Sequence, residues 1–378
     1  MRDQKKKYLF MYLKTGGGHI APARAVAKHL HNNFQNSTEV LLIDGFEKTK
    51  RFARFIVEDG YRILQSKTKW IFELIYAVHK FELISQLSAF LVSMNMKKYL
   101  TENILNERPD KIVLFHFFLI KPVYKILEKN KLNIPVITVV TDPYTAHPIW
   151  FLRKKQHFIV FSEKLKSYCI KKRINEKNIK VFPFILDEKY SGTFSQTEIV
   201  ENKKRFGFTS HKILLIMGGG DGIPNGVLIL KSILNSFPNY GIAFVCGRNK
   251  LMHDEAVRLK EKYKLENLKI FGFIDFVHDL LSISDIVITK CGASTFMEIL
   301  LSKKIPIVNS YIWEQEKGNV DFLVDNGMGI FEKRISKLPF IINNLFSEKI
   351  ELMKYKNNIE KGNLKNGTAE VANHIISF

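Results

Sequence analysis

The stretch KTGGGHIAPARAVAKHL, Lys14 to Leu30, decides the fold because it directly follows the apolar run YLFMYL, Tyr8 to Leu13. Three glycines and a histidine lead into a run that is typical of a helix. A second stretch, LLIMGGGDGIPNGVLIL from Leu214 to Leu230, repeats this order of apolar run, glycines and helix. Glycines let backbone N–H groups approach oxygens closely, and a helix N-terminus carries a partial positive charge. Both stretches are therefore candidate phosphate-binding loops.

Short apolar runs alternate with helical patterns on both sides of a polar stretch, Leu186–Asn202. Strands buried on both faces of a parallel sheet read as continuous apolar runs, and strand–helix alternation indicates doubly wound α/β units. We therefore expect two Rossmann-like domains, 1–190 and 191–345, and a helical segment, 346–378. The expected strands are Tyr8–Leu13, Val40–Ile43, Lys111–Phe115, Val136–Val140, His157–Phe161, Ile213–Met217, Ile242–Val245, Lys269–Phe271, Ile286–Thr289 and Ile305–Val308.

The composition is basic, with 58 Lys and Arg against 37 Asp and Glu and a net charge of +21. Such a chain is attracted to nucleic acid, phosphate-bearing ligands or anionic lipid, and the charge alone does not separate these partners. The three cysteines, Cys169, Cys246 and Cys291, are widely spaced and lack metal-ligand spacing. We expect buried thiols in a reducing compartment.

No membrane-spanning helix is expected. The charge-free stretch Leu83–Met96 has 14 residues, whereas a spanning helix needs roughly 18 or more. The region Arg51–Leu100 has no good strand, and its apolar residues Trp70, Ile71, Leu74, Ile75 and Val78 repeat at helical spacing among lysines. This region is either an ordinary packed helix pair or a basic, aromatic surface that enters the lipid headgroup layer.

Neither glycine loop matches GxGxxG or GxxxxGK[ST]. The alternative to phosphate binding is that both loops are simply tight strand–helix turns. His19 favours a functional reading of the first loop. A histidine at the carboxyl end of a sheet strand faces the crevice where ligands bind, and its ordinary pKa suits proton abstraction. The alternative is a histidine that merely caps the helix.

Three features follow the second loop. Phe271–Ile274 ends a strand with a flat apolar patch that suits a base. Lys290–Glu298 runs from a strand through a glycine turn into a helix, with Ser294 and Thr295 placed for phosphate and Glu298 for ribose hydroxyls. Trp313–Asn319 is a polar cluster that suits sugar hydroxyls. Glu298 alone would read as a solvated carboxylate, but together the three features predict a nucleotide-sugar pocket.

At these residues the sequence resembles the monogalactosyldiacylglycerol synthases and the bacterial processive diacylglycerol glucosyltransferases of glycosyltransferase family 28. The segments that carry the resemblance are TGGGH (Thr15–His19), VVTDPYTAHPIWF (Val139–Phe151), LLIMGGGDG (Leu214–Gly222), VCGRN (Val245–Asn249), GF (Gly272–Phe273), DIVITKCGASTFMEIL (Asp285–Leu300) and EQEKGNVDFLVDNGMG (Glu314–Gly329). The chain departs from the family pattern at Ile20, where Arg is usual. It also departs at Ala293-Ser294, where Pro-Gly is usual, and at Glu314, where Gly is usual.

The resemblance implies a GT-B fold: two Rossmann-like domains with parallel sheets that face each other across a cleft, and a C-terminal helix that packs back on the N-terminal domain. It implies that 1–190 binds the acceptor and the membrane, and that 191–345 binds the UDP-sugar. The implied reaction moves galactose or glucose from a UDP-sugar to diacylglycerol with inversion, giving a β-glycoside. It implies a peripheral protein on the cytoplasmic face of an anionic membrane, and allows activation by anionic phospholipid. No cofactor is expected, and no Asp-x-Asp motif is present to hold a metal.

Site residues follow from matching positions. The resemblance makes His19 and Asp142 the catalytic candidates and places Gly17, Gly18, His147 and Trp150 on the acceptor side. The donor-side residues it implies are Gly218, Gly219, Gly220, Asp221, Arg248, Phe273, Ile274, Gly292, Ser294, Thr295, Glu298, Gln315, Glu316 and Asn319.

Three rival functions remain open at this point. One is transfer of N-acetylglucosamine to a polyprenyl-diphosphate lipid, although that family does not share TDPYTAHPIWF. The second is an NAD-dependent oxidoreductase, which the missing GxGxxG and acidic partner disfavour. The third is a nucleic-acid-binding protein, for which charge is the sole support and no recognition motif is present; we expect no nucleic-acid partner.

Overall fold

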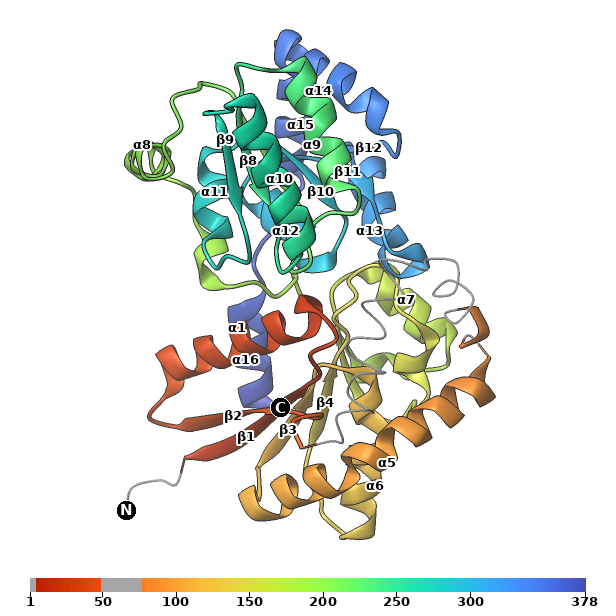
Figure 1. The fold of residues 1–378 in the computed structure, drawn as a ribbon. Coiled ribbons are helices and arrows are strands. Elements are labelled where there is room, and N and C mark those ends of the chain that lie inside the picture. The colour runs from red at the N-terminus through yellow and green to blue at the C-terminus, as the bar shows by residue number, and fades with distance from the viewer. Residues whose placement is uncertain (1–4, 49–76, 80) are drawn as a thin grey trace. The chain divides into compact units, whose positions relative to one another are not determined.

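The computed structural model describes residues 5–48, 77–79 and 81–378, and the chain divides into two compact units (Figure 1). Unit 1 comprises Met1–Glu188 and Asn366–Phe378, and unit 2 comprises Lys189–Lys365. The expected helical segment 346–378 is therefore divided between them. Its first helix, α15 (Lys349–Lys361), belongs to unit 2, and its second, α16 (Thr368–Ser377), belongs to unit 1.

The described part of unit 1 contains a six-stranded parallel sheet with the order β2-β1-β3-β4-β5-β6. The strands are β1 (Lys6–Tyr12), β2 (Thr38–Asp44), β3 (Lys111–Leu114), β4 (Val136–Val139), β5 (His157–Val160) and β6 (Ile179–Val181). The helices are α1 (Gly17–Phe34), α5 (Glu82–Glu107), α6 (Ile120–Lys129), α7 (Glu163–Lys171) and α16, with 3₁₀ turns η2 (Phe117–Leu119), η3 (Pro148–Phe151) and η4 (Glu176–Asn178). Five of these strands are those predicted from the sequence.

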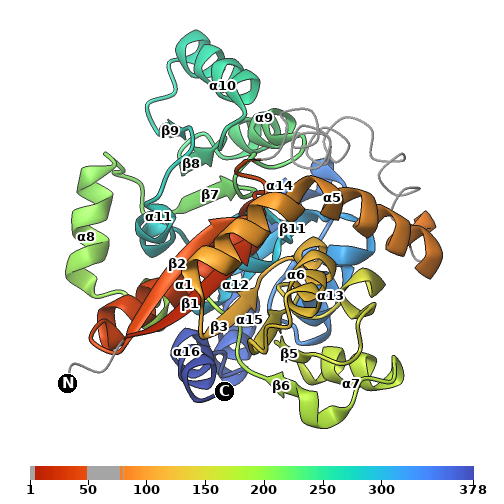
Figure 2. The same cartoon turned by 90° about the horizontal axis from the view of Figure 1, so that it is seen from below.

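Alternate side chains of β1 serve the two faces of this sheet, as the period of a strand requires. Leu9 and Met11 belong to a buried apolar cluster to which α5, α6 and α7 also contribute. α5 lies alongside α6 (Figure 2). The ring of Tyr8 instead faces the ammonium group of Lys111 on the other side of the sheet. This ammonium donates a hydrogen bond to the Ile376 carbonyl of α16, and α16 packs against α1. The sheet is thus covered on both faces.

α16 is tied to unit 1 at both ends. Near its start, the Thr368 hydroxyl donates to the Leu186 carbonyl at 2.6 Å, and the Asn366 amide donates to the same carbonyl at 3.0 Å. At its end, the buried Lys111 ammonium donates to the carbonyls of Ile375 and Ile376. A cation at a helix C-terminus is favourable because the last carbonyls carry partial negative charge. The expectation that a C-terminal helix packs back on the N-terminal domain is confirmed.

The described part of unit 2 repeats the architecture with a six-stranded parallel sheet in the order β12-β11-β10-β7-β8-β9. Its strands are β7 (Ile213–Met217), β8 (Gly241–Val245), β9 (Leu268–Phe271), β10 (Ile286–Lys290), β11 (Ile305–Ser310) and β12 (Ile330–Phe331). Its helices are α8 (Gln196–Arg205), α9 (Gly226–Ser236), α10 (Lys250–Tyr263), α11 (Val277–Ile283), α12 (Ala293–Leu301), α13 (Trp313–Asp325), α14 (Leu338–Ser347) and α15, with 3₁₀ turns η5 (Glu188–Ser191) and η6 (Ile335–Lys337).

Each sheet has one point at which the strand order reverses, and a glycine loop lies at each. In unit 1, β1 lies between β2 and β3, so the loop after β1 adjoins the end of β3. In unit 2, β7 lies between β8 and β10, so the loop after β7 adjoins the start of α12. Ligands of open α/β sheets bind at such switch points, outside the carboxyl ends of the strands. The fold therefore places both loops where binding is expected.

Within the described ranges, no helix is both long enough and apolar enough to cross a bilayer. Of the residues on which the interfacial-helix hypothesis depended, Trp70, Ile71, Leu74 and Ile75 lie outside the described residues, as does 51–76 as a whole.

Candidate active-site residues

The second glycine loop, which contains Gly218, Gly219, Gly220 and Asp221, is pressed against the loop after β8. The Arg248 N–H donates to the Gly220 carbonyl at 2.8 Å. Gly247 has a φ of +59°, and a Cβ there would collide with the same carbonyl. Only glycine combines this left-handed backbone with so close an approach. The two loops are thus fixed to each other by backbone contacts that tolerate no side chain.

An exposed aromatic platform lies beside this loop. The Arg248 guanidinium stacks on the Phe273 ring, with its central carbon 4.2 Å from the ring centroid. Phe273 follows β9 and is 60% exposed, with Ile274 half-buried next to it. A Cβ added to Gly220 would lie 2.9 Å from Arg248 Nη1 and 3.9 Å from the Phe273 ring. The stacked pair is therefore at the edge of the glycine loop, where a flat ring could add to the stack.

The start of α12 meets the same loop from the other side. Gly292 is the N-cap of α12 and offers no side-chain cap. The Ser294 hydroxyl in its first turn is buried without a hydrogen-bond partner in the described part of the chain. Thr295 Oγ1 lies 3.7 Å from where a Cβ of Gly219 would be. A helix N-terminus and a glycine loop at one place favour a phosphate group.

α13 is tied to the loop after β10 by two of its polar side chains. Glu316 forms an ion pair with Lys290 at 2.8 Å and accepts the Ile312 N–H at 2.6 Å. The buried Asn319 side chain donates to the Cys291 carbonyl at 3.0 Å. Both residues therefore position backbone here, in addition to any role toward a sugar. Glu298 and Gln315 lie on the same two helices, α12 and α13.

Lys290 was not singled out by sequence reasoning. It is the last residue of β10, directly before the glycine turn, and its side chain is mostly buried. A cation at the carboxyl end of a central strand, next to a candidate phosphate loop, is the signal that could have identified it.

In unit 1 the first glycine loop is open. Gly16 has a φ of +123°, which favours glycine, and α1 begins at Gly17 without a side-chain cap. A Cβ added to Gly17 or Gly18 would meet no atom of the described residues within 4 Å. The loop therefore leaves space for another molecule to approach the backbone.

His19 is the third residue of α1 and is buried. Its Nδ1 lies 3.0 Å from the Phe115 carbonyl oxygen and 2.7 Å from Thr141 Oγ1. Burial lowers the pKa of His19 to about 4, and the Phe115 carbonyl opposes this shift. The imidazole is therefore neutral at pH 7, as a general base must be before it accepts a proton.

A second buried histidine, His116, packs against His19. The ring centroids are 4.4 Å apart in an edge-on arrangement. His116 Nδ1 accepts the Phe118 N–H at 3.2 Å, and its Nε2 lies 3.1 Å from Thr15 Oγ1. Burial, and then the neighbouring His19, lower the pKa of His116 well below its usual value. Sequence reasoning missed this residue, whose signal was its place directly after an apolar strand, in VLFHFF.

The segment Val139–Phe151 supplies the rest of this cluster. The buried Asp142 carboxylate accepts the Trp150 indole N–H at 2.9 Å. The Trp150 ring centroid lies 6.1 Å from that of His19. His147 caps η3, because its Nδ1 accepts the Ile149 N–H at 3.1 Å. The structure thus brings His19, Asp142 and Trp150 together, with His147 at the start of the turn that carries Trp150.

Two further features bear on the site. No group of three or more His, Cys, Asp or Glu side chains suited to hold a metal occurs among residues 5–48, 77–79 and 81–378.

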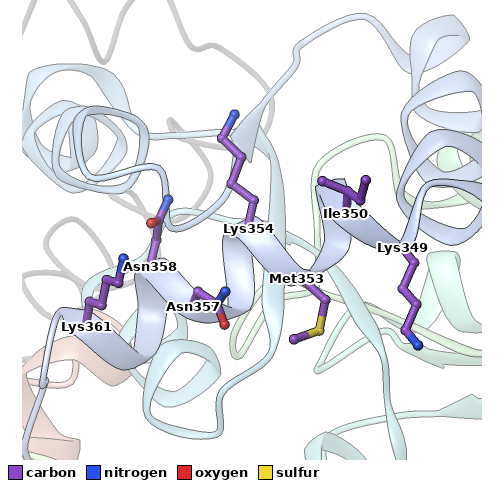
Figure 3. Close-up of a pocket in the computed structure, with 7 residues that line it drawn as sticks. All are labelled: Lys349, Ile350, Met353, Lys354, Asn357, Asn358 and Lys361. Carbon is purple, nitrogen blue, oxygen red and sulfur yellow. The ribbon is translucent and has the colours of Figure 1, made fainter.

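A shallow hollow of about 530 Å³ on unit 2 is lined by α15 residues, from which Lys349, Lys354 and Lys361 extend (Figure 3). It contains none of the predicted site residues. Asn358 of this helix donates instead to the Gly327 carbonyl at 3.0 Å and so holds α15 to the end of α13.

Comparison with known proteins gives two family matches that follow the two units. Residues 19–183 match the family described as monogalactosyldiacylglycerol (MGDG) synthase, and residues 213–373 match the glycosyltransferase family 28 C-terminal domain. The protein belongs to glycosyltransferase family 28. Its first half is of the MGDG-synthase type, which confirms the resemblance seen in the sequence.

Individual family 28 relatives agree with this assignment. The chain is 25% identical over 362 residues to a probable chloroplastic monogalactosyldiacylglycerol synthase of Nicotiana tabacum, covering 91% of this chain and 65% of the relative. It is 24% identical over 383 residues to a processive diacylglycerol beta-glucosyltransferase of Bacillus pumilus, covering 99% of this chain and 95% of the relative. The chain thus spans about two thirds of the plant protein and nearly all of the bacterial one.

Among solved structures, Anabaena HepE in complex with UDP-glucose resembles the chain with a TM-score of 0.61 and 14% identity, covering 98% of each chain. At this identity the likeness concerns the fold alone. Together with the two parallel sheets it confirms the GT-B fold class expected for the family.

Proposed function

We propose that this family 28 protein transfers a hexose, galactose or glucose, from a UDP-sugar to diacylglycerol and forms a β-glycosyl diacylglycerol with inversion. The observation that carries the proposal is that one chain contains two different switch-point loops. One carries a buried, neutral imidazole, and the other meets a helix N-terminus that suits a diphosphate. The family matches over both halves support the same reaction.

Unit 2 binds the donor in this proposal. Backbone N–H groups of Gly218–Asp221 and the start of α12, with Ser294 and Thr295, hold the diphosphate. The exposed Phe273 ring, backed by Arg248 and next to Ile274, faces the uracil. Glu298 accepts the ribose hydroxyls, and Gln315, Glu316 and Asn319 meet the hexose or the adjoining phosphate. N–H groups aimed at the diphosphate stabilise the negative charge that grows on it as UDP leaves.

Unit 1 supplies the base and the acceptor side. The diacylglycerol hydroxyl oxygen forms a bond to the anomeric carbon, the bond from that carbon to the UDP oxygen breaks, and the hydroxyl proton passes to His19. Gly17 and Gly18 leave room for the acceptor, while Asp142, His147 and Trp150 line its path. Asp142 acts through Trp150, since its carboxylate accepts the indole N–H. The proposal requires no cofactor, because backbone donors stabilise the leaving group.

Product analysis tests the proposal. The protein is incubated with each labelled UDP-hexose and liposomes that contain diacylglycerol, and the glycolipids are resolved. We expect label in a monohexosyl diacylglycerol.

We expect His19→Ala to lower turnover by about 10²- to 10⁴-fold, the usual contribution of one general base. Exposed His31 on the same helix provides the matched control, His31→Ala, which should keep wild-type turnover. Label in a liposome lipid other than diacylglycerol, or no transfer from either UDP-hexose, would refute the assignment.

The proposed acceptor lies in a bilayer, and α5 offers a surface to reach it. Leu83, Leu87, Leu91 and Met94 recur at spacings of four, four and three residues along α5, and all are more than half exposed. Next to this stripe, the ammonium groups of Lys121 and Lys125 lie 5.5 and 5.1 Å from the centroid of the Phe90 ring. An apolar stripe with adjoining cations is typical of helices that lie in the headgroup layer of an anionic membrane.

We therefore propose that the protein docks as a peripheral membrane protein on an anionic lipid surface, on the cytoplasmic face that the family resemblance implies. Flotation should occur with anionic liposomes and weaken as salt rises, because screening reduces the roughly 1 kcal/mol that each lysine contributes near such a surface. Leu87→Ser with Leu91→Ser should weaken flotation. Leu251→Ser, which changes an exposed leucine of α10, is the control and should not. Equal flotation with neutral liposomes would exclude this mode of docking.

A further inference from the structure

The contacts of His19 determine which of its ring nitrogens carries the proton. A carbonyl oxygen can only accept a hydrogen bond, so the 3.0 Å contact with the Phe115 carbonyl requires a proton on Nδ1. With Nδ1 protonated, Thr141 Oγ1 at 2.7 Å accepts as well, and the Nδ1–H is shared between the two oxygens. In the opposite tautomer the Nδ1 lone pair would face the carbonyl lone pairs. Nε2 is then left unprotonated, and it makes no hydrogen bond to a described residue.

Both hydrogen-bond acceptors of His19 lie just beyond the carboxyl ends of strands in the unit 1 sheet. Phe115 directly follows β3, and Thr141 lies two residues beyond the end of β4. These strands are neighbours in the sheet, and β3 also neighbours β1, which leads into the His19 loop. The buried Thr141 hydroxyl and the Phe115 carbonyl thus reach His19 from adjacent strand ends. This arrangement fixes the rotation of the ring as well as its tautomer.

His116 has the opposite proton pattern, which reinforces the arrangement. Its Nδ1 accepts the Phe118 N–H, so its proton is on Nε2, which donates to Thr15 Oγ1. Both rings are neutral and buried, and they pack edge to face at 4.4 Å. Among the described residues, the titratable groups linked to His19 by these contacts are His116 and, through the Trp150 indole, Asp142.

We propose that Thr141 is a positioning residue for the transfer reaction: its hydroxyl oxygen, with the Phe115 carbonyl, holds the His19 proton on Nδ1 and aims the free Nε2 lone pair at the acceptor hydroxyl. This inference rests on the proposed role of His19 as the base. As Nε2 takes the acceptor proton, the ring gains a positive charge and the Nδ1–H bond to Thr141 strengthens. The hydrogen bond therefore acts on the chemical step rather than on donor binding.

The test uses Thr141→Val, which keeps the shape and removes the hydroxyl, and Thr141→Ser, which restores it. We expect Thr141→Val to lower kcat between about tenfold and a hundredfold, the range for a hydrogen bond to a charged group. The KM for the UDP-hexose should stay unchanged, and Thr141→Ser should recover most of kcat. Thr138→Val is the matched control, because the buried Thr138 hydroxyl on β4 donates to Gln156 at 2.9 Å instead.

A second readout is independent of activity. In protein labelled with ¹⁵N-histidine, the His19 signals, identified by their loss in His19→Gln, should show a protonated Nδ1 and an unprotonated Nε2 at neutral pH. Thr141→Val should change the Nδ1 signal and the pH at which the ring titrates, and Thr138→Val should change neither. His19 signals that are the same in Thr141→Val and wild type would overturn the positioning role, whatever the rates. If Thr141→Val changes the His19 signals but keeps the kcat that Thr138→Val shows, His19 is not the base and the positioning role falls with it, whereas the measured transfer leaves the proposed function standing.

Discussion

The buried imidazole of His19 should make unit 1 sensitive to mild acid. In the unfolded chain its pKa is near 6.5, whereas burial lowers the pKa in the folded protein to about 4. Between these values the unfolded state binds a proton that the folded state does not, so stability falls as the pH drops from about 6.5 to about 4. Each pKa unit corresponds to about 1.4 kcal/mol. The full effect is thus about 3 kcal/mol, of which about 2 kcal/mol is lost by pH 5.

The assay compares wild type with His19→Gln. Denaturant unfolding is followed at pH 7 and pH 5 by Trp150 fluorescence, in a background in which Trp70 and Trp313 are replaced by Phe so that the signal reports unit 1. Wild type should lose about 2 kcal/mol more between these pH values than His19→Gln does. Burial, the larger cause, lowers the pKa of His116 as well, and this part of the His116 shift is common to both proteins and cancels in the comparison.

The matched control is His31→Gln, which removes an exposed histidine near the end of the same helix. It should show the wild-type dependence on pH. Equal losses in wild type and His19→Gln would refute the reasoning, because they would mean that His19 takes up a proton as readily in the folded protein as in the unfolded chain.

Three further predictions concern other parts of the molecule. Gly247→Ala should abolish UDP binding in calorimetry while the far-ultraviolet circular dichroism stays unchanged, because its Cβ would push the β8 loop away from the Gly220 carbonyl. Phe273→Ala should weaken UDP binding by about 1–3 kcal/mol, the usual value for stacking on a base, whereas Phe340→Ala, which removes an equally exposed ring on α14, should not. Lys111→Met should cost about 1–3 kcal/mol, since it leaves two carbonyls at the end of α16 without their donor; limited proteolysis near Asn366 should become faster, and an unchanged rate would show that this lysine does not hold the helix.

The sequence predicted the central strands because each is a continuous apolar run buried on both faces. Ten strands were expected and all ten are present. The two that were missed, β6 and β12, are short strands at sheet edges. In β6 the buried Ile179 is followed by the exposed Lys180, which reads as loop. The edge strands β2 and β9 were predicted, but strands as short as β6 and β12 are set by the neighbour with which they pair, and local apolarity does not reveal that neighbour.

The same limit applies to the site. Glycines before a helix mark a loop in any sequence, so both loops and His19 were found. His116 was not, because it adjoins His19 only through the pairing of β1 with β3, in which Met11 lies opposite Leu114. Similarly, Glu316 is held by Lys290, which lies 26 residues away. Strand order decides which side chains meet, and strand order is a property of the whole sheet. The assignments of individual residues to donor and acceptor remain predictions.

The return of α16 to unit 1 has a consequence for biosynthesis. Residues 189–365 are contiguous, so unit 2 has its whole sequence available as soon as Lys365 leaves the ribosome. The earlier segment, although made first, waits for the helix encoded at 368–377, against which α1 packs. The sequence of the second half is therefore complete before that of the first, and a released chain that ends before residue 368 should hold a protease-resistant second half beside an unfinished first one.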